Sequence, residues 1–262
     1  MVKKTERMLN METVKLVLNE ERNVTLTGYI QPVDGEFWGM TKRPAIIVMP
    51  GGGYQYCSAR EADPVAFPYL QAGYQAFVLV YSVKDNAVWD NPLRDYDQTF
   101  ETIVEHAEEW HIDTDRIAII GFSAGGHLAA CAATMAKHKP RAAILGYPVI
   151  SSFARWNASV PDPADAVDDN TCPCFVFASR NDGTVPIQDS LNFLNALNAH
   201  GIPFETHIYS YANHGFSTCE PQLNNRDWCC NRTPNWVHDS VEWLRETVGD
   251  FTDGVLGDKK RW

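Results

Sequence analysis

One short stretch, residues 117–127, leaves this chain few folds to adopt. A run of apolar residues at 117–120 leads directly into Gly-Phe-Ser-Ala-Gly at 121–125, and an alanine-rich, helix-forming segment follows. A strand, a tight turn and a helix in this order hold a serine at the carboxyl end of the strand. A side chain at either glycine would crowd the strand or the helix start, and the first amides of the helix suit a developing negative charge. Ser123 is therefore the candidate nucleophile, the alternative being a serine in an ordinary strand-to-helix turn.

Apolar runs and helical patterns alternate along most of the chain. Continuous apolar runs at 45–49 and 76–81 predict strands that are buried, the first on both faces, and apolar residues at helical spacing predict helices. This alternation predicts an α/β fold with a mainly parallel central sheet and helices on both faces. The predicted strands are residues 45–49, 76–81, 117–120, 142–147, 174–179 and 204–209, and the predicted helices are residues 63–72, 94–111, 124–137, 187–200 and 236–248.

Three further segments complete the expected organisation. Alternating apolar residues at 13–18 and 24–30 predict an N-terminal antiparallel hairpin at the edge of the sheet. No repeat or low-complexity linker divides the 262 residues, so we expect a single domain over residues 1–262. Residues 149–171 are rich in proline and aspartate and are long for a plain loop, so we expect a small cap over the site.

Charge and composition disfavour several functions. The net charge is −11 and the only basic run is at 259–261, so nucleic-acid binding is not expected. No apolar stretch is long enough to span a membrane, and residues 1–10 lack the apolar core of a signal peptide. The seven cysteines follow no regular framework, which predicts free thiols and a cytoplasmic protein. The pairs at 172–174 and 229–230 lack zinc-ligand spacing, so no metal site is expected.

A serine hydroxyl needs a base before it can act as a nucleophile. His214 lies in the loop after the predicted strand 204–209, at the same edge of the sheet as Ser123. An imidazole with a free pKa near ~6.5 can serve as base and then as acid close to neutral pH. The other histidines fit less well: His127, for example, lies in the helix after Ser123 and is expected to have a structural role.

The base in turn needs a carboxylate that orients it. Asp182 follows the predicted strand 174–179 and also lies at a carboxyl end. Serine, aspartate and histidine then occur in a chain order known for such triads. The alternative is that Asp182 only forms a turn with Gly183. Asp189 is a weaker candidate because it falls inside the next predicted helix.

A tetrahedral intermediate carries an oxyanion that needs preorganised donors. One candidate is the amide of Ala124, directly after the nucleophile. The others are the amides of Gly52 and Gly53, in the glycine loop (residues 50–54) that follows the predicted strand 45–49. Without side chains, this loop lets the backbone approach a substrate carbonyl. A phosphate-binding loop is the alternative, but no Lys-Ser or Lys-Thr pair follows.

Together these residues resemble the α/β-hydrolase superfamily, and within it the lipase/esterase group with a His-Gly-Gly-Gly loop, in which Pro50 replaces the histidine. Over roughly residues 44–243 the chain is most similar to intracellular acetyl-esterase and xylan-esterase-like proteins. The motifs that carry this likeness are Pro50-Gly-Gly-Gly-Tyr54, Ser58-Ala-Arg60-Glu61, Tyr81-Ser82-Val83, Pro92-Leu93, Gly121-Phe-Ser-Ala-Gly-Gly-His127 and Gly146-Tyr-Pro148. The resemblance implies a serine esterase that needs no cofactor and acts on short acyl esters, often acetyl groups on sugars.

Some side chains are candidates for binding such a substrate. Arg60 could contact it, or could pair with Glu61 or a nearby aspartate. Aromatic side chains could stack on a sugar, and the candidates are Tyr54, Trp89, Trp156 and Trp228. The alternatives to an esterase are an amide hydrolase, aminopeptidase-like or arylformamidase-like, and a binding module that kept the fold without turnover. No oligomeric state is predicted.

Overall fold

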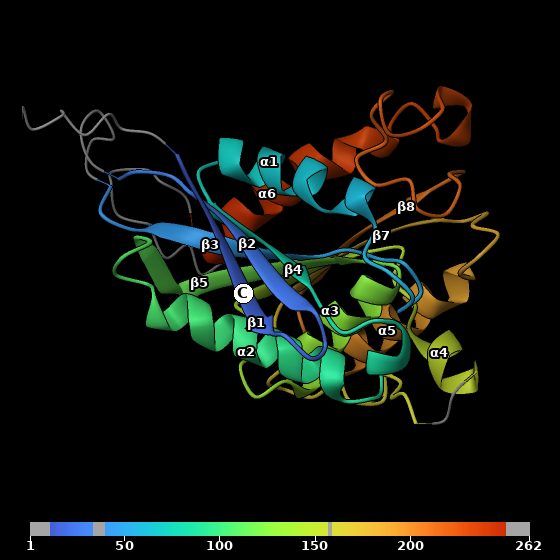
Figure 1. Cartoon of the computed structure of the whole chain (residues 1–262). Coiled ribbons are helices and arrows are strands. Elements are labelled where there is room, and N and C mark those ends of the chain that lie inside the picture. The colour runs from blue at the N-terminus through green and yellow to red at the C-terminus, as the bar shows by residue number, and fades with distance from the viewer. Residues whose placement is uncertain (1–10, 34–39, 157–158, 250–262) are drawn as a thin grey trace, which may run out of the picture.

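The computed structural model describes residues 11–33, 40–156 and 159–249, and in these ranges eight strands form one sheet (Figure 1). Their order across the sheet is β1-β2-β4-β3-β5-β6-β7-β8. The strands are β1 (Glu12–Asn19), β2 (Val24–Ile30), β3 (Arg43–Met49), β4 (Gln75–Val80), β5 (Ile112–Phe122), β6 (Ala142–Gly146), β7 (Cys174–Ser179) and β8 (Phe204–Tyr209). The helices are α1 (Asp63–Gln71), α2 (Asn91–Glu105), α3 (Ala124–Met135), α4 (Ser151–Trp156), α5 (Ile187–Ala199) and α6 (Trp236–Val248).

The sheet is mainly parallel, as the alternating pattern predicts. Strands β3 to β8 pair in parallel, whereas β1 pairs with β2 and β2 pairs with β4 in antiparallel fashion. The predicted hairpin is therefore confirmed, and it lies at one edge of the sheet. Because the strands from β3 onward run the same way, their carboxyl ends meet at one edge, where the loops after β3, β5, β7 and β8 come together.

Helices cover both faces, so the core has two layers. Helices α1 and α6 lie on one face of the sheet, and α2, α3 and α5 lie on the other (Figure 1). Neighbouring residues of β5 face opposite layers: Ile119 packs in the cluster with Leu128 of α3, and Ile120 packs in the cluster with Trp236 of α6. Alternate side chains of a strand point to opposite faces, which is why these fully apolar runs form strands that are buried on both sides.

Two elements differ from the prediction by more than two residues at one end or both, and the other predicted bounds agree within two residues. Helix α2 begins at Asn91, with proline in its first turn, and ends at Glu105 rather than at residue 111. The apolar pattern continues past the helix end because Ala107 and Trp110 are buried in the turns that follow. Strand β5 begins at Ile112 instead of 117, since Ile112 already pairs with Arg43 of β3.

The segment 149–171, predicted as a cap, contains α4 and a series of turns. The buried carboxylate of Asp189 holds the start of this segment by accepting hydrogen bonds from the amides of Ile150 and Ser152 at 2.8 and 3.0 Å. The cap role and the single domain over residues 1–262 stay predictions. The polar start at 1–10 and the basic run at 259–261 lie outside the described residues.

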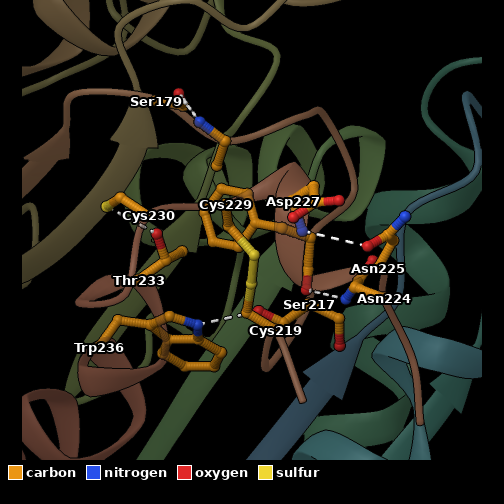
Figure 2. The surroundings of a disulfide bond; sticks show 12 residues. Ser179, Ser217, Cys219, Asn224, Asn225, Asp227, Cys229, Cys230, Thr233 and Trp236 are labelled. Atoms are coloured by element: carbon orange, nitrogen blue, oxygen red, sulfur yellow. Dashed lines mark hydrogen bonds between the residues drawn. A yellow bond between two sulfur atoms is a disulfide. The ribbon is translucent and has the colours of Figure 1, made fainter. Parts of the chain in front are cut away.

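The prediction of free cysteines is wrong for one pair. Cys219 and Cys229 form a disulfide between two parts of the long segment that connects β8 to α6 (Figure 2). Neither cysteine lies in a regular element, so their spacing in the sequence gives no sign of the bond. The free thiols are Cys57, Cys131, Cys172, Cys174 and Cys230. Disulfides are rare in reducing compartments, so the cysteines no longer favour a cytoplasmic protein. Among the residues described, no helix has the length and apolar character needed to cross a bilayer.

Candidate active site

Ser123 occupies a sharp turn between β5 and α3. Its φ and ψ angles are 53° and −114°, in a region that residues with a side chain rarely adopt. The amide of Ser123 donates to the Gly146 carbonyl at 3.0 Å, and its carbonyl accepts from the Val149 amide at 3.1 Å. These bonds to the end of β6 and the residues after it hold the turn in place.

The glycines of this turn allow close packing, as the sequence predicts. A Cβ added at Gly121 would collide with the Gly125 carbonyl, and one at Gly125 would collide with the Met49 carbonyl at the end of β3. Helix α3 therefore starts in direct contact with the ends of β5 and β3. The Ser123 side chain is left at the carboxyl edge of the sheet.

His214 lies between Ser123 and Asp182. Its Nε2 is 2.8 Å from Ser123 Oγ, and its Nδ1 is 2.7 Å from Asp182 Oδ2. An ionised carboxylate only accepts hydrogen bonds, so Nδ1 carries the proton, and Nε2 is left to accept from the serine hydroxyl. The Asp182 side chain is 2% exposed and that of His214 is 18% exposed. The buried carboxylate thus orients the imidazole, and the imidazole itself stays partly exposed to solvent.

The turn-forming alternative for Asp182 is also realised. Its Oδ1 accepts from the amides of Thr184 and Val185 at 2.8 and 3.0 Å, while Oδ2 faces His214. One oxygen therefore fixes the carboxylate in its own loop and the other orients the imidazole. The competing candidate, Asp189, instead holds the start of α4 and also accepts from the Ser152 hydroxyl at 2.8 Å.

The glycine loop lies directly beside Ser123. A Cβ added at Gly51 would lie 2.9 Å from Ser123 Cβ. The Gly51 amide is already used, since it donates to Glu61 Oε2 at 2.8 Å. Within the described residues, no acceptor is found for the amides of Gly52, Gly53 and Ala124. These three amides are therefore available to an incoming oxyanion.

The candidate substrate-binding residues fall into two groups. Tyr54 is buried and bonded to His127 Nδ1 at 2.9 Å, so it is no stacking platform, and half-buried Trp89 lies edge-on to His127, with ring centroids 5.6 Å apart. Arg60 contacts a different part of the chain: it is half-buried and donates to Asn224 Oδ1 at 3.4 Å. Among the described residues, no ion pair joins Arg60 to Glu61. Trp228 is 44% exposed.

Trp156, the remaining aromatic candidate, ends α4, and its side chain lies outside the part of the chain that the structure describes.

Within the described ranges, no group of three or more His, Cys, Asp or Glu side chains could hold a metal ion.

Two buried groups near the site were not singled out from the sequence. Glu61, considered only as a partner for Arg60, is 3% exposed and bonds to both Gly51 and Tyr147. Tyr147 follows β6 with a φ of 36°, and its ring lies edge-on to His214. Burial raises the pKa of the Glu61 carboxyl and of the Tyr147 hydroxyl. Both residues lie in motifs that resemble the esterase group, but a motif does not show what its residues contact.

Known proteins are similar to this chain in sequence and in fold. A family model named BD-FAE matches residues 39–141, and the prolyl oligopeptidase family model matches residues 152–246. The solved structure of MGS-M1, an α/β-hydrolase enzyme from a Medee basin deep-sea metagenome library, is 40% identical. The match covers 91% of this chain and 98% of that one, with a TM-score of 0.85. The carboxylesterase Cest-2923 from Lactobacillus plantarum is 26% identical over 90% of this chain and 97% of its own, with a TM-score of 0.81.

A curated relative is also similar. The acetylxylan esterase of Xylanibacter ruminicola is 30% identical over 198 residues, which are 66% of this chain and 41% of that protein. The chain spans well under half the length of the curated relatives it matches first. The near-complete match to a solved α/β hydrolase agrees with the sheet order and with the strand-turn-helix at Ser123. The chain therefore belongs to the α/β-hydrolase family, in its esterase-like branch.

Proposed function

We propose that this chain is a serine carboxylesterase that removes short acyl groups, above all acetyl, from carbohydrate esters. The observation that carries the proposal is the continuous hydrogen-bonded chain from Ser123 Oγ through His214 to Asp182. It lies at the carboxyl edge of the sheet, beside three amides that have no acceptor within the described residues.

In the first step Ser123 Oγ attacks the ester carbonyl carbon, and His214 Nε2 takes the hydroxyl proton. The imidazole becomes positively charged, and Asp182 Oδ2, 2.7 Å from Nδ1, stabilises that charge. The carbonyl oxygen becomes an oxyanion and is held by the amides of Gly52, Gly53 and Ala124.

Collapse of this intermediate breaks the bond between the carbonyl carbon and the alcohol oxygen. His214 returns its proton to the leaving alcohol, and the acyl group stays on Ser123. Water then attacks the acyl-enzyme, His214 accepts a proton from it, and the acid leaves. All proton transfers pass through one ring nitrogen, Nε2, which is 2.8 Å from the serine oxygen.

The substrate class rests on the relatives. The acetylxylan esterase of X. ruminicola is named for an acetylated polysaccharide, and Cest-2923 is named a carboxylesterase. Among the aromatic candidates, Trp228 is exposed and Trp89 is half-buried, so both can face a sugar. Tyr54 cannot, because it is buried and bonded to His127.

One observation favours a second candidate function. The prolyl oligopeptidase family model matches residues 152–246, the part of the chain that carries Asp182 and His214. The same three side chains could therefore cleave an amide. An aminoacyl p-nitroanilide compared with p-nitrophenyl acetate separates the two chemistries.

The test is to measure initial rates on p-nitrophenyl acetate, butyrate and octanoate, and acetate release from acetylated xylo-oligosaccharide. The proposal predicts fast acetate release from the sugar and a fall in rate from the two-carbon to the eight-carbon ester. Ser123→Ala should lower turnover by roughly 10⁴-fold or more while its circular dichroism stays that of the wild type. Turnover of the p-nitrophenyl esters without acetate release from the oligosaccharide would rule out the carbohydrate substrate. If no substrate is turned over and a fluorophosphonate probe does not label Ser123, the chain is a binding module.

A further inference from the structure

Glu61 is a buried carboxylate that the proposed reaction does not use. It ends the 3-10 turn η1 (Ala59–Glu61), just past the glycine loop, and is 3% exposed. Its two oxygens have different partners: Oε2 accepts from the Gly51 amide at 2.8 Å, and Oε1 accepts from the Tyr147 hydroxyl at 2.5 Å. Because a buried charge is costly unless it is hydrogen-bonded, two such donors account for how this carboxylate is tolerated.

The first partner links Glu61 to the candidate oxyanion donors. Gly51 lies between the carboxylate and the nucleophile, since a Cβ added there would lie 2.8 Å from Glu61 Oε2 and 2.9 Å from Ser123 Cβ. The bonded Gly51 amide fixes the peptide between Pro50 and Gly51, which is one peptide before the amide of Gly52. Glu61 therefore sets the position of the loop relative to Ser123.

The second partner links Glu61 to the loop after β8 that carries His214 and Ser217. The Tyr147 hydroxyl donates to Glu61 and accepts from the Ser217 amide at 3.0 Å. The Tyr147 ring lies edge-on to the His214 imidazole, with centroids 5.1 Å apart and planes at 69°. The Ser217 hydroxyl in turn donates to the Arg60 carbonyl, which closes a ring of contacts back to the turn that bears Glu61.

The charges around Glu61 come from several elements. Arg60 and His214 lower the cost of its ionisation, and a Cβ added at Gly215, next to His214, would lie 3.3 Å from Arg60 Nη2 and 4.0 Å from Glu61 Oε1. Tyr147, Tyr81 and Cys57 also face it, and burial raises the pKa of each, that of Cys57 to about 12, so they stay neutral. Asp182 is the other carboxylate that faces His214.

We propose that Glu61 is a positioning residue: its carboxylate holds the Gly51 peptide and the Tyr147 hydroxyl together, so that the oxyanion donors and the imidazole keep their places around Ser123. Its negative charge also favours the positively charged imidazole that forms during the reaction. This inference rests on the proposed serine-esterase function. It adds a residue that never touches the substrate but acts through Gly51, Tyr147 and His214.

The test is Glu61→Gln, measured as kcat, KM and the pH profile of kcat/KM on p-nitrophenyl acetate. The amide oxygen can still accept from Gly51, but the NH2 group faces the Tyr147 hydroxyl, which loses its acceptor. We expect kcat to fall about 10- to 100-fold with KM changed less than about threefold, since positioning acts in the transition state. Removing the negative charge also disfavours the positively charged imidazole, so the acid limb of the profile should move to lower pH.

Two variants serve as controls. Tyr147→Phe keeps the Glu61 charge and the ring beside His214 but removes the hydroxyl, so kcat should fall about tenfold while the acid limb stays in place. Glu109→Gln makes the same chemical change at an exposed position and should leave the whole profile unchanged.

Unchanged kcat and an unmoved acid limb in folded Glu61→Gln would overturn the inference. Should that variant fail to fold, Tyr147→Phe decides: wild-type kcat there would overturn it as well. Should the wild type turn over no ester, the proposed function is what fails. The rate of Ser123 labelling by a fluorophosphonate then replaces kcat, and equal labelling of wild type and both variants would overturn the inference.

Discussion

The Tyr54 hydroxyl lies 2.9 Å from His127 Nδ1, and this contact ties the glycine loop to helix α3. The other ring nitrogen, Nε2, lies 3.0 Å from the Pro161 carbonyl. A carbonyl only accepts, so Nε2 carries the proton, and Nδ1 accepts from the tyrosine hydroxyl. The fully buried imidazole is therefore neutral and joins the loop, the helix and the segment 159–171.

This neutral histidine predicts acid sensitivity. Burial lowers the pKa of His127 to about 4, whereas the unfolded chain has a histidine pKa near ~6.5. Between these values the unfolded state binds a proton that the folded state does not, so stability falls as the pH drops from about 6.5 to about 4 and this effect levels off below. The difference corresponds to about 3 kcal/mol. Urea unfolding at pH 7 and pH 4.5 measures it.

The matched variant is His127→Gln, whose amide can also accept from Tyr54 and donate to Pro161. It should lose clearly less stability than the wild type between the two pH values. His238→Gln, at an exposed position, should behave as the wild type. An equal loss in all three proteins would show that His127 does not carry the acid response.

The central parallel strands follow from the sequence because their apolar runs are continuous and are buried on both faces, and most helices follow from apolar residues at helical spacing. The end of α2 does not, because Ala107 and Trp110 continue the apolar pattern in turns that only tertiary packing creates. Ser123 and His214 each follow a parallel strand, so the sequence places both at one edge of the sheet. The contact between them depends on the folded loops.

The contacts of Glu61 and His127 depend on burial, which a lone sequence does not show. His127 is expected to be structural and is buried, yet its bonds to Tyr54 and Pro161 join three separate segments. The Cys219–Cys229 disulfide joins two loop positions, and no periodic pattern marks such positions.

Substitution of the two aspartates, Asp182 and Asp189, should have different effects, one on catalysis and the other on stability. Asp182→Asn keeps an oxygen for the amides of Thr184 and Val185 but loses the charge that fixes the His214 tautomer, so kcat should fall about 10⁴-fold with little change in stability. Asp189→Asn weakens the bonds to Ile150 and Ser152, so the free energy of unfolding should fall by about 1–3 kcal/mol. Steady-state kinetics and urea unfolding of both variants check this. A larger kinetic loss in Asp189→Asn would reverse the assignment.

The glycine loop offers a matched pair of substitutions. Gly52 has a φ of 133°, and a Cβ there would collide with the Tyr56 carbonyl, so Gly52→Ala must displace the loop. We expect its kcat to fall about 10²- to 10³-fold, as on loss of an oxyanion donor. Gly53 has a φ of 62° but open space around it, so Gly53→Ala costs only the backbone strain of about 1–2 kcal/mol and a smaller loss of kcat. Equal kinetic losses would argue against this difference.

The disulfide predicts a stability change outside the hydrogen-bonded chain at Ser123. The loop that it closes carries Asn224 (Figure 2). The Asn224 side chain donates to the Phe216 carbonyl at 2.5 Å and accepts from Arg60. The bond joins cysteines ten residues apart, so replacing both by serine should lower the free energy of unfolding by about 3 kcal/mol, because the unfolded chain gains freedom. Urea unfolding measures this loss.

The same bond predicts a thiol count. Of the seven cysteines, five are free, so the denatured, unreduced protein should react with five equivalents of a thiol reagent, and with seven after reduction. Cys230→Ser, next to the bond, is the control and should remove one thiol while leaving most of the stability. Seven reactive thiols before reduction, or no loss of stability in the double variant, would show that Cys219 and Cys229 are not joined, since only a formed crosslink restricts the unfolded chain.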